Sequence, residues 1–233
     1  TSAVTNVVQV PNDACVDAAR KRLFVVNKGS SVVSEYQLDT LSTAREITWT
    51  PMDREPTETH FHVYCAKDRL YLVDGAWEPA LFTVDDLDAT PTVKDQTANV
   101  SGVGALVLND AQDELFYWEQ FGWGAGNLNT SVRRVMTRDL GMVDTSTITY
   151  SEGFVRDPVD APILLDEQRG LVFAKNLIFD ASNLTRVVYT LPGKAQTPTD
   201  GALENTYALS AKAGLFASRN NVYELERYDV VTR

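Results

Sequence analysis

The segment "ARKRLFVVN", residues 19–27, decides the fold because its pattern recurs four more times along the chain. Each copy opens with charged or small residues typical of a turn and continues as a short apolar strand that begins on a leucine. The other copies are "AKDRLYLVD" (66–74), "AQDELFYWE" (111–119), "EQRGLVFAKN" (167–176) and "AKAGLFASRN" (211–220). The leucines are Leu23, Leu70, Leu115, Leu171 and Leu215, and their spacing of roughly 45 to 55 residues is typical of propeller blades.

Further short strands flank each copy, and helical periodicity with caps is absent from the sequence. Four antiparallel strands per repeat predict an all-β fold, a β-propeller of five four-stranded blades in one domain. The predicted blades cover approximately residues 12–50, 58–98, 103–151, 161–192 and 205–233. The strand at 3–11 precedes the first repeat, and we expect it to complete the last blade and close the ring. The alternative is that the chain is a piece of a longer propeller.

The first two repeats resemble those of the YVTN-type β-propeller proteins. "KRLFVVNKGSSVVSEYQLDTLS" (21–42) and "DRLYLVDG" (68–75) carry the leucine, aromatic and valine pattern of that repeat. The later repeats depart from it: Trp118-Glu119 replaces the Val-Asn step, and the fourth repeat lacks most of its third strand. The resemblance implies an architecture and no catalytic residue, because that family is functionally mixed and a fold does not determine a function.

Composition and charge exclude some partners. The 233 residues carry a formal net charge of −11, which argues against nucleic acid and against anionic membrane as the main partner. No apolar run approaches the length of a membrane span, so we expect no membrane insertion. Asn-x-Ser/Thr sequons at Asn99, Asn129 and Asn183 favour an extracellular or cell-surface protein.

Long segments between strands cluster on one predicted face of the propeller. They are residues 49–60, 73–81, 118–131, 152–161 and 192–205, and binding residues commonly lie on such loops. Aromatic side chains stand out among them: Trp77, Trp118, Phe121 and Trp123, three of which alternate with glycines. These rings predict a surface that binds a protein or a glycan, so that the chain acts as a non-enzymatic binding or scaffold module. The alternative is a small apolar core that holds a long loop on the rim.

The stretch "ETHFHVYC", residues 58–65, holds both histidines of the chain. His60 and His62 share one face of a strand, where two imidazoles can reach one metal ion if a third ligand is present. Counting back from the repeat leucines matches His62 with Cys15 and Tyr207, and His60 with Asp13 and Asn205. The predicted polar sector at the mouth of the central channel is Asp13, Cys15, His60, His62, Asn205 and Tyr207.

This sector supports a second hypothesis, a hydrolase or lactonase-like enzyme with its site at the channel mouth. Such an enzyme could use a divalent metal on His60 and His62, although no cofactor is predicted from any complete motif. Ordinary hydrogen bonds at a water-filled mouth explain the same residues without a function. No catalytic residue is assigned.

The same count places Cys15 and Cys65 three positions apart on adjacent strands, roughly 10 Å at the rise of a strand. We therefore expect free thiols. The carboxylates of "DDLDAT" (85–90) and "NDAQDE" (109–114) lack the spacing of a calcium loop and are interpreted as solvated turn residues.

Overall fold

The computed structural model describes residues 11–27, 31–49, 61–74, 80–96, 100, 102–121, 129–146, 163–174, 177–190, 206–210, 214–219 and 222–228. Every regular element within these ranges is a β-strand. The described residues contain no helix that is long and apolar enough to cross a bilayer.

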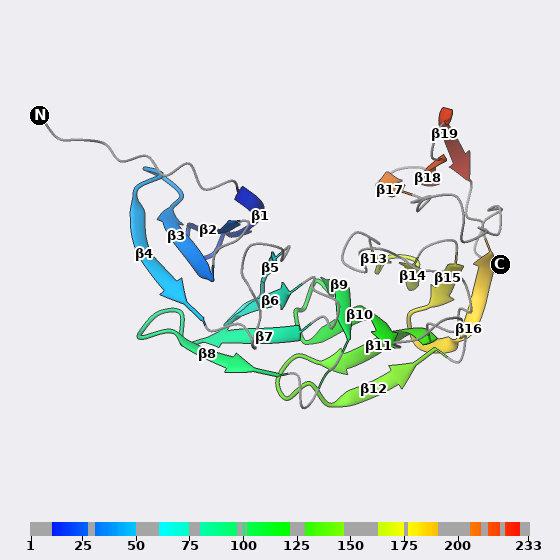
Figure 1. Cartoon of the computed structure of the whole chain (residues 1–233). Helices are drawn as coiled ribbons and strands as arrows, with labels where there is room; N and C mark the ends of the chain where they lie inside the picture. Colours follow the sequence, from blue (N-terminus) through cyan, green and yellow to red (C-terminus); the bar gives the residue numbers. More distant parts are fainter. Residues whose placement is uncertain are drawn as a thin grey trace, which may run out of the picture. The chain divides into compact units, whose positions relative to one another are not determined.

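The strands form five antiparallel sheets, in each of which consecutive strands are neighbours (Figure 1). Sheet 1 comprises β1 (Pro11–Asp17), β2 (Arg22–Asn27), β3 (Val32–Gln37) and β4 (Thr43–Thr48). Sheet 2 comprises β5 (Phe61–Cys65), β6 (Leu70–Asp74), β7 (Ala80–Asp85) and β8 (Thr92–Asp95). Sheet 3 comprises β9 (Val103–Leu108), β10 (Glu114–Phe121), β11 (Asn129–Met136) and β12 (Met142–Thr145). Sheet 4 comprises β13 (Ile163–Asp166), β14 (Leu171–Ala174), β15 (Leu177–Asp180) and β16 (Asn183–Thr190), and sheet 5 comprises β17 (Thr206–Ser210), β18 (Gly214–Arg219) and β19 (Val222–Tyr228).

The predicted all-β fold is confirmed, and sheets 1 to 4 each have the predicted four antiparallel strands. The repeated leucine lies at or next to the start of the second strand of each sheet, as the sequence pattern predicts. Closure of a five-bladed ring by the N-terminal strand stays a prediction, because residues 1–10 lie outside the described residues.

The chain divides into two compact units, residues 1–98 and 99–233. In the first unit, the facing sides of sheets 1 and 2 make one core. Its buried members are Phe24, Val26, Val33, Ile47, Trp49, Val63, Leu70, Leu72, Ala80, Phe82, Val84 and Leu87. Alternate residues of β2 and β6 enter this core because side chains on a strand point to opposite faces in turn.

In the second unit, sheets 3 and 4 pack in the same way. The buried cluster is Ala105, Phe116, Trp118, Val132, Ile163, Val172, Ala174, Leu177, Phe179 and Leu184. Trp118 is only 2% exposed, so its ring belongs to the core between two sheets. The prediction that Trp118 offers a surface to a ligand is therefore wrong. The sequence misled because it shows the glycines after Trp118 and does not show that β10 continues to Phe121.

The connections between strands differ in length at the two ends of each sheet. The first-to-second and third-to-fourth connections are short, for example residues 18–21 and 38–42 in sheet 1. The segments from one sheet to the next include 49–60, 146–162 and 191–205. The connection between β10 and β11 is residues 122–128, shorter than the predicted loop at 118–131, because both strands extend into it.

Candidate functional site

The most specific polar arrangement among the predicted site residues joins the first strands of sheets 1 and 2. Asp13 lies on β1 and His62 on β5, and His62 Nδ1 is 3.2 Å from Asp13 Oδ2. The same carboxylate oxygen accepts the backbone N–H of Val63 at 3.0 Å, and the other oxygen accepts that of Ala14 at 2.8 Å. Asp13 thus caps a backbone donor on β5, which is an edge strand of sheet 2.

Electrostatics favour the ionised form of Asp13. Burial raises the pKa of this carboxyl, but the hydrogen bonds from His62, Val63 and Ala14 outweigh burial and hold the pKa below its ordinary value. The side chains of Asp13 and His62 are 30% and 23% exposed, so the pair is reachable by solvent. Chemically, a carboxylate on one imidazole nitrogen fixes the ring and leaves the other nitrogen for a ligand or a proton.

The two cysteines form a disulfide, so the expectation of free thiols is wrong. Cys15 and Cys65 have Cα atoms 5.6 Å apart, within the range that a disulfide spans. The error lies in the assumption that both leucines are equally far from their turns. The connections 18–21 and 66–69 have the same length, but Leu23 is the second residue of β2 and pairs with Val16, whereas Leu70 is the first residue of β6 and pairs with Cys65.

The same difference changes which residues lie at one height. Asp13 pairs with Val26 and His62 pairs with Val73, each three residues after its repeat leucine. His62 therefore corresponds to Asp13, and the predicted matches of His62 with Cys15 and of His60 with Asp13 are wrong. In sheet 4 the residue at this height is Ile163, which pairs with Ala174, three residues after Leu171. A shift of two residues keeps the same face of the strand and moves each match one side chain along that face.

The structure places the remaining predicted site residues only in part. Phe121 and Tyr207 lie on β10 and β17, and their side chains are outside the description. The other four, His60, Trp77, Trp123 and Asn205, lie outside the described residues. Within the described part of the chain, no group of three His, Cys, Asp or Glu side chains comes close enough together to hold a metal ion.

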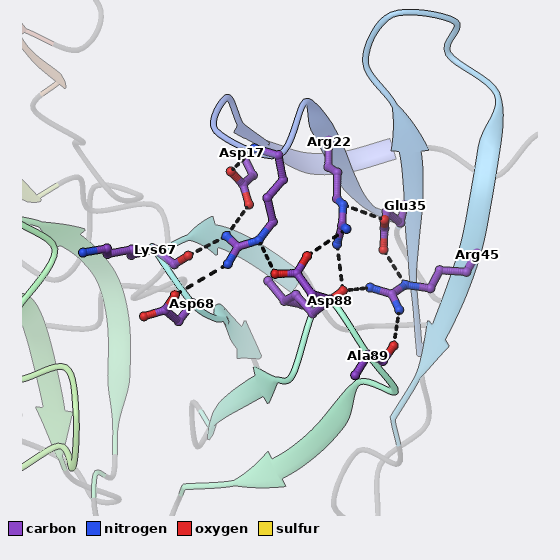
Figure 2. A network of polar contacts seen from close by, with 10 residues as sticks. Asp17, Arg22, Glu35, Arg45, Lys67, Asp68, Asp88 and Ala89 are labelled. Atoms are coloured by element: carbon purple, nitrogen blue, oxygen red, sulfur yellow. Dashed lines mark hydrogen bonds and ion pairs between the residues drawn. The ribbon is translucent and has the colours of Figure 1, made fainter.

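A network of charged side chains that the sequence analysis did not predict joins sheets 1 and 2 (Figure 2). Arg20 and Arg22 of sheet 1 each reach Asp88, in the turn between β7 and β8, at 2.9 Å. Glu35 is 2% exposed and pairs with Arg22 at 3.3 Å and with Arg45 at 2.5 Å. Arg45 also donates to the carbonyl of Ala89 at 2.9 Å.

This charge network assigns roles to the carboxylates of residues 85–90. Asp88 and Asp85 bind arginines and a lysine of the chain itself: Arg20, Arg22, Arg69 and Lys94. The signal in the sequence was the three basic residues before Leu23, Arg20, Lys21 and Arg22, together with the acidic turn one repeat later. Sequence spacing alone could not show that these segments meet, because the contact depends on how one sheet packs on the next.

Among the residues that the structure describes, sheets 3 and 4 are joined by fewer polar contacts of the same kind. Arg134 on β11 donates to the carbonyl of Ala181 at 2.7 Å, and Asp144 on β12 accepts the backbone N–H of Leu184 at 2.7 Å. In both units, therefore, an arginine from the outer half of one sheet binds backbone carbonyls in the third-to-fourth turn of the next sheet.

Comparison with known proteins supports the architecture. No protein family model and no curated protein sequence matches the chain. Among solved structures, the chain is similar to the β-propeller domain of Cps50 (Swd1) from Myceliophteria thermophila, at 15% identity and a TM-score of 0.57, over 96% of this chain and 72% of that one. It is also similar to the Dos1 propeller, at 10% identity and a TM-score of 0.60, over 91% of this chain and 55% of that one. At these identities the similarity shows a β-propeller fold.

Proposed function

We propose that this chain is a non-enzymatic binding or scaffold propeller that recognises a protein or a glycan. The observation that carries this proposal is the unequal length of the connections. Residues 49–60, 146–162 and 191–205 all leave their sheets at the end opposite the first-to-second and third-to-fourth turns. Variable loops held at one end of rigid sheets are a common way to build a recognition surface. The similarity to solved β-propellers supports the rigid sheets from which such loops would project.

We also place the protein outside the cell or at its surface. The Cys15–Cys65 disulfide supports this location, because disulfides persist in oxidising compartments and are rare in the cytosol. The bond joins β1 and β5 of the first unit, and both cysteines pack against the apolar cluster between sheets 1 and 2. A bond in this position is expected to serve stability.

The proposal is tested with the two tryptophans in the connecting segments that the structure does not describe. Trp77→Ala and Trp123→Ala are each compared with the wild-type chain for binding to a glycan array and to surface proteins of intact cells. We expect at least a tenfold loss of binding with a nearly unchanged thermal midpoint. Leu41→Ala, at an exposed position in the short β3–β4 turn, is the matched control and should bind normally. Loss of binding in the control, or equal binding by all variants, would contradict the proposal.

The Asp13–His62 contact favours a second candidate, a hydrolase or lactonase-like enzyme. Its base would be the His62 nitrogen that Asp13 leaves free. A panel of simple esters and lactones tests it: turnover that falls at least a hundredfold in both Asp13→Asn and His62→Gln supports the enzyme. For a metal-dependent form, the purified wild type should contain metal and His60→Ala should lose it. Activity that survives both substitutions at the pair excludes this site.

A further inference from the structure

The turn between β15 and β16 presents a sequon in a defined geometry. Asn183, Leu184 and Thr185 open β16, and the side chains of Asn183 and Thr185 are exposed. The Thr185 hydroxyl donates to Asn183 Oδ1 at 2.6 Å, and the Thr185 backbone N–H donates to the same oxygen at 3.1 Å. Both bonds use the oxygen of the carboxamide. Within the described residues, Asn183 Nδ2 donates to no protein group.

Leu184, the residue between Asn183 and Thr185, anchors β16. Leu184 is fully buried in the core between sheets 3 and 4, and its N–H donates to Asp144 at 2.7 Å. Alternation along the strand then directs Asn183 and Thr185 to the opposite face. The neighbouring Ser182 and Arg186 are exposed as well, so a large group on Asn183 would extend into solvent without displacing the core.

We propose that Asn183 is a site of N-linked glycosylation. Nδ2 would attack the anomeric carbon of a polyprenyl-diphosphate-linked oligosaccharide. The new bond joins nitrogen to that carbon, the bond from the carbon to the diphosphate oxygen breaks, the polyprenyl diphosphate leaves, and the nitrogen gives up one proton to a base of the transferase. No electron transfer is required. The Thr185 hydroxyl is the sequon hydroxyl that such a transferase reads.

Two independent observations point to this modification. The first is the exposed sequon with its oxygen held by Thr185. The second is the Cys15–Cys65 disulfide, which fits the same oxidising route through the cell. The inference rests on the extracellular location in the proposed function and is separate from ligand recognition. The β15–β16 turn lies at the short-turn end of its sheet, away from the long connections, so the glycan would leave the recognition surface free.

The test is site occupancy in the full chain secreted by a eukaryotic host. The protein is released from its glycans with peptide:N-glycanase in heavy-oxygen water, and peptides that contain Asn183 are read by mass spectrometry. We expect residue 183 to appear as labelled aspartate. Asn183→Gln and Thr185→Ala should abolish occupancy, whereas Thr185→Ser should retain it. Ser182→Ala removes an adjacent exposed hydroxyl outside the sequon and should leave occupancy unchanged.

Unlabelled Asn183 in the secreted, folded wild type overturns the proposal, whether or not Asn99 and Asn129 carry glycans. Loss of occupancy in Ser182→Ala also overturns it, because the effect would then follow from the turn and not from the sequon. The same preparations are assayed for ligand binding. If wild-type protein carries a glycan on Asn183 but binds no ligand, the recognition surface is refuted and the glycosylation stands. If wild-type protein binds its ligand but carries no glycan on Asn183, the glycosylation is refuted and the recognition surface stands.

Discussion

The disulfide between Cys15 and Cys65 yields the sharpest prediction about stability. The cysteines are 50 residues apart in sequence, so the bond closes a long loop in the unfolded chain. In the chain-entropy account, a loop of that length loses about 14 cal/mol/K, which is about 4 kcal/mol at 25 °C. Replacement of both cysteines by alanine should therefore lower the free energy of unfolding of the first unit by about 3 to 4 kcal/mol.

Denaturation by urea with tryptophan fluorescence measures this loss. Trp49 is buried in the core of the first unit, and its emission reports the unfolding of sheets 1 and 2. The decisive comparison uses a reductant. Reduction should shift the wild-type transition to that of the Cys15→Ala/Cys65→Ala variant and should leave the variant unchanged. Single variants at either position should resemble the double variant, because each removes the same cross-link.

Two results would refute this reasoning. One is a loss below about 1 kcal/mol in the double variant, which would mean that the bond constrains the unfolded chain little because that chain retains structure of its own. The other is an equal shift of wild type and variant on reduction, which would mean that the reductant acts elsewhere. A larger loss in one single variant than in the double variant would indicate a new defect from the unpaired thiol.

Further predictions concern the turns and the buried carboxylates. Leu41 has a left-handed φ of 53° and is exposed, so Leu41→Gly should relieve backbone strain and raise the thermal midpoint by the equivalent of about 0.5 to 1 kcal/mol. Leu140 has a similar φ of 57° but is buried, so Leu140→Gly should lose core packing and lower the midpoint by the equivalent of about 2 to 4 kcal/mol. Because the pKa of Asp13 is lowered in the folded protein, its carboxylate stabilises the fold above the ordinary pKa of 3.8, and this contribution disappears as the pH falls through the folded pKa. Urea denaturation at a series of acid pH values should therefore show that the free energy of unfolding depends less on pH in Asp13→Asn than in the wild type. Burial raises the pKa of Glu119 more than its bonds to Ser131 and Arg133 lower it. The free energy of unfolding should therefore fall as the pH rises from 4.5 through the folded pKa, and Glu119→Gln should remove that fall in the same urea experiments. Glu35→Gln should cost about 2 to 3 kcal/mol by urea denaturation, less than a fully buried pair, because its arginine partners reach solvent; an unchanged midpoint would show that the charge network adds nothing to the sheet contact.

The sequence was sufficient for the all-β fold and its antiparallel sheets because each repeat leucine lies at or next to the start of a second strand. Leu70 and Leu115 are fully buried and Leu171 nearly so. The period of two along each strand then specifies which neighbours enter the core. Such a pattern survives changes in turn length, because every strand carries its own alternation.

The candidate site was less predictable because it depends on the register of the strands directly. Counting from Leu23 and Leu70 assumes that both leucines are equally far from the turn, whereas Leu23 is the second residue of β2 and Leu70 is the first residue of β6. The error left Asp13 and His62 in the same predicted sector but mismatched them, and it separated Cys15 from Cys65 by too many positions. The contacts of Arg20 and Arg45 were missed for a different reason, since they depend on the packing of one sheet against another.

The contacts between β1 and β5 bear on the choice between the two candidate functions. Asp13 uses one oxygen for both His62 and the Val63 N–H, and the disulfide fixes the same two strands two residues further along from Asp13 and Val63. A carboxylate that caps the edge of a strand in this way has a structural task whether or not His62 reacts. If stability were its only task, Asp13→Asn and His62→Gln would change the unfolding midpoint and leave ligand binding intact. The packing of β1 against β5 therefore accounts for the contacts of Asp13, and a loss of turnover in these two variants without a loss of stability is the result that would assign the pair to an enzyme.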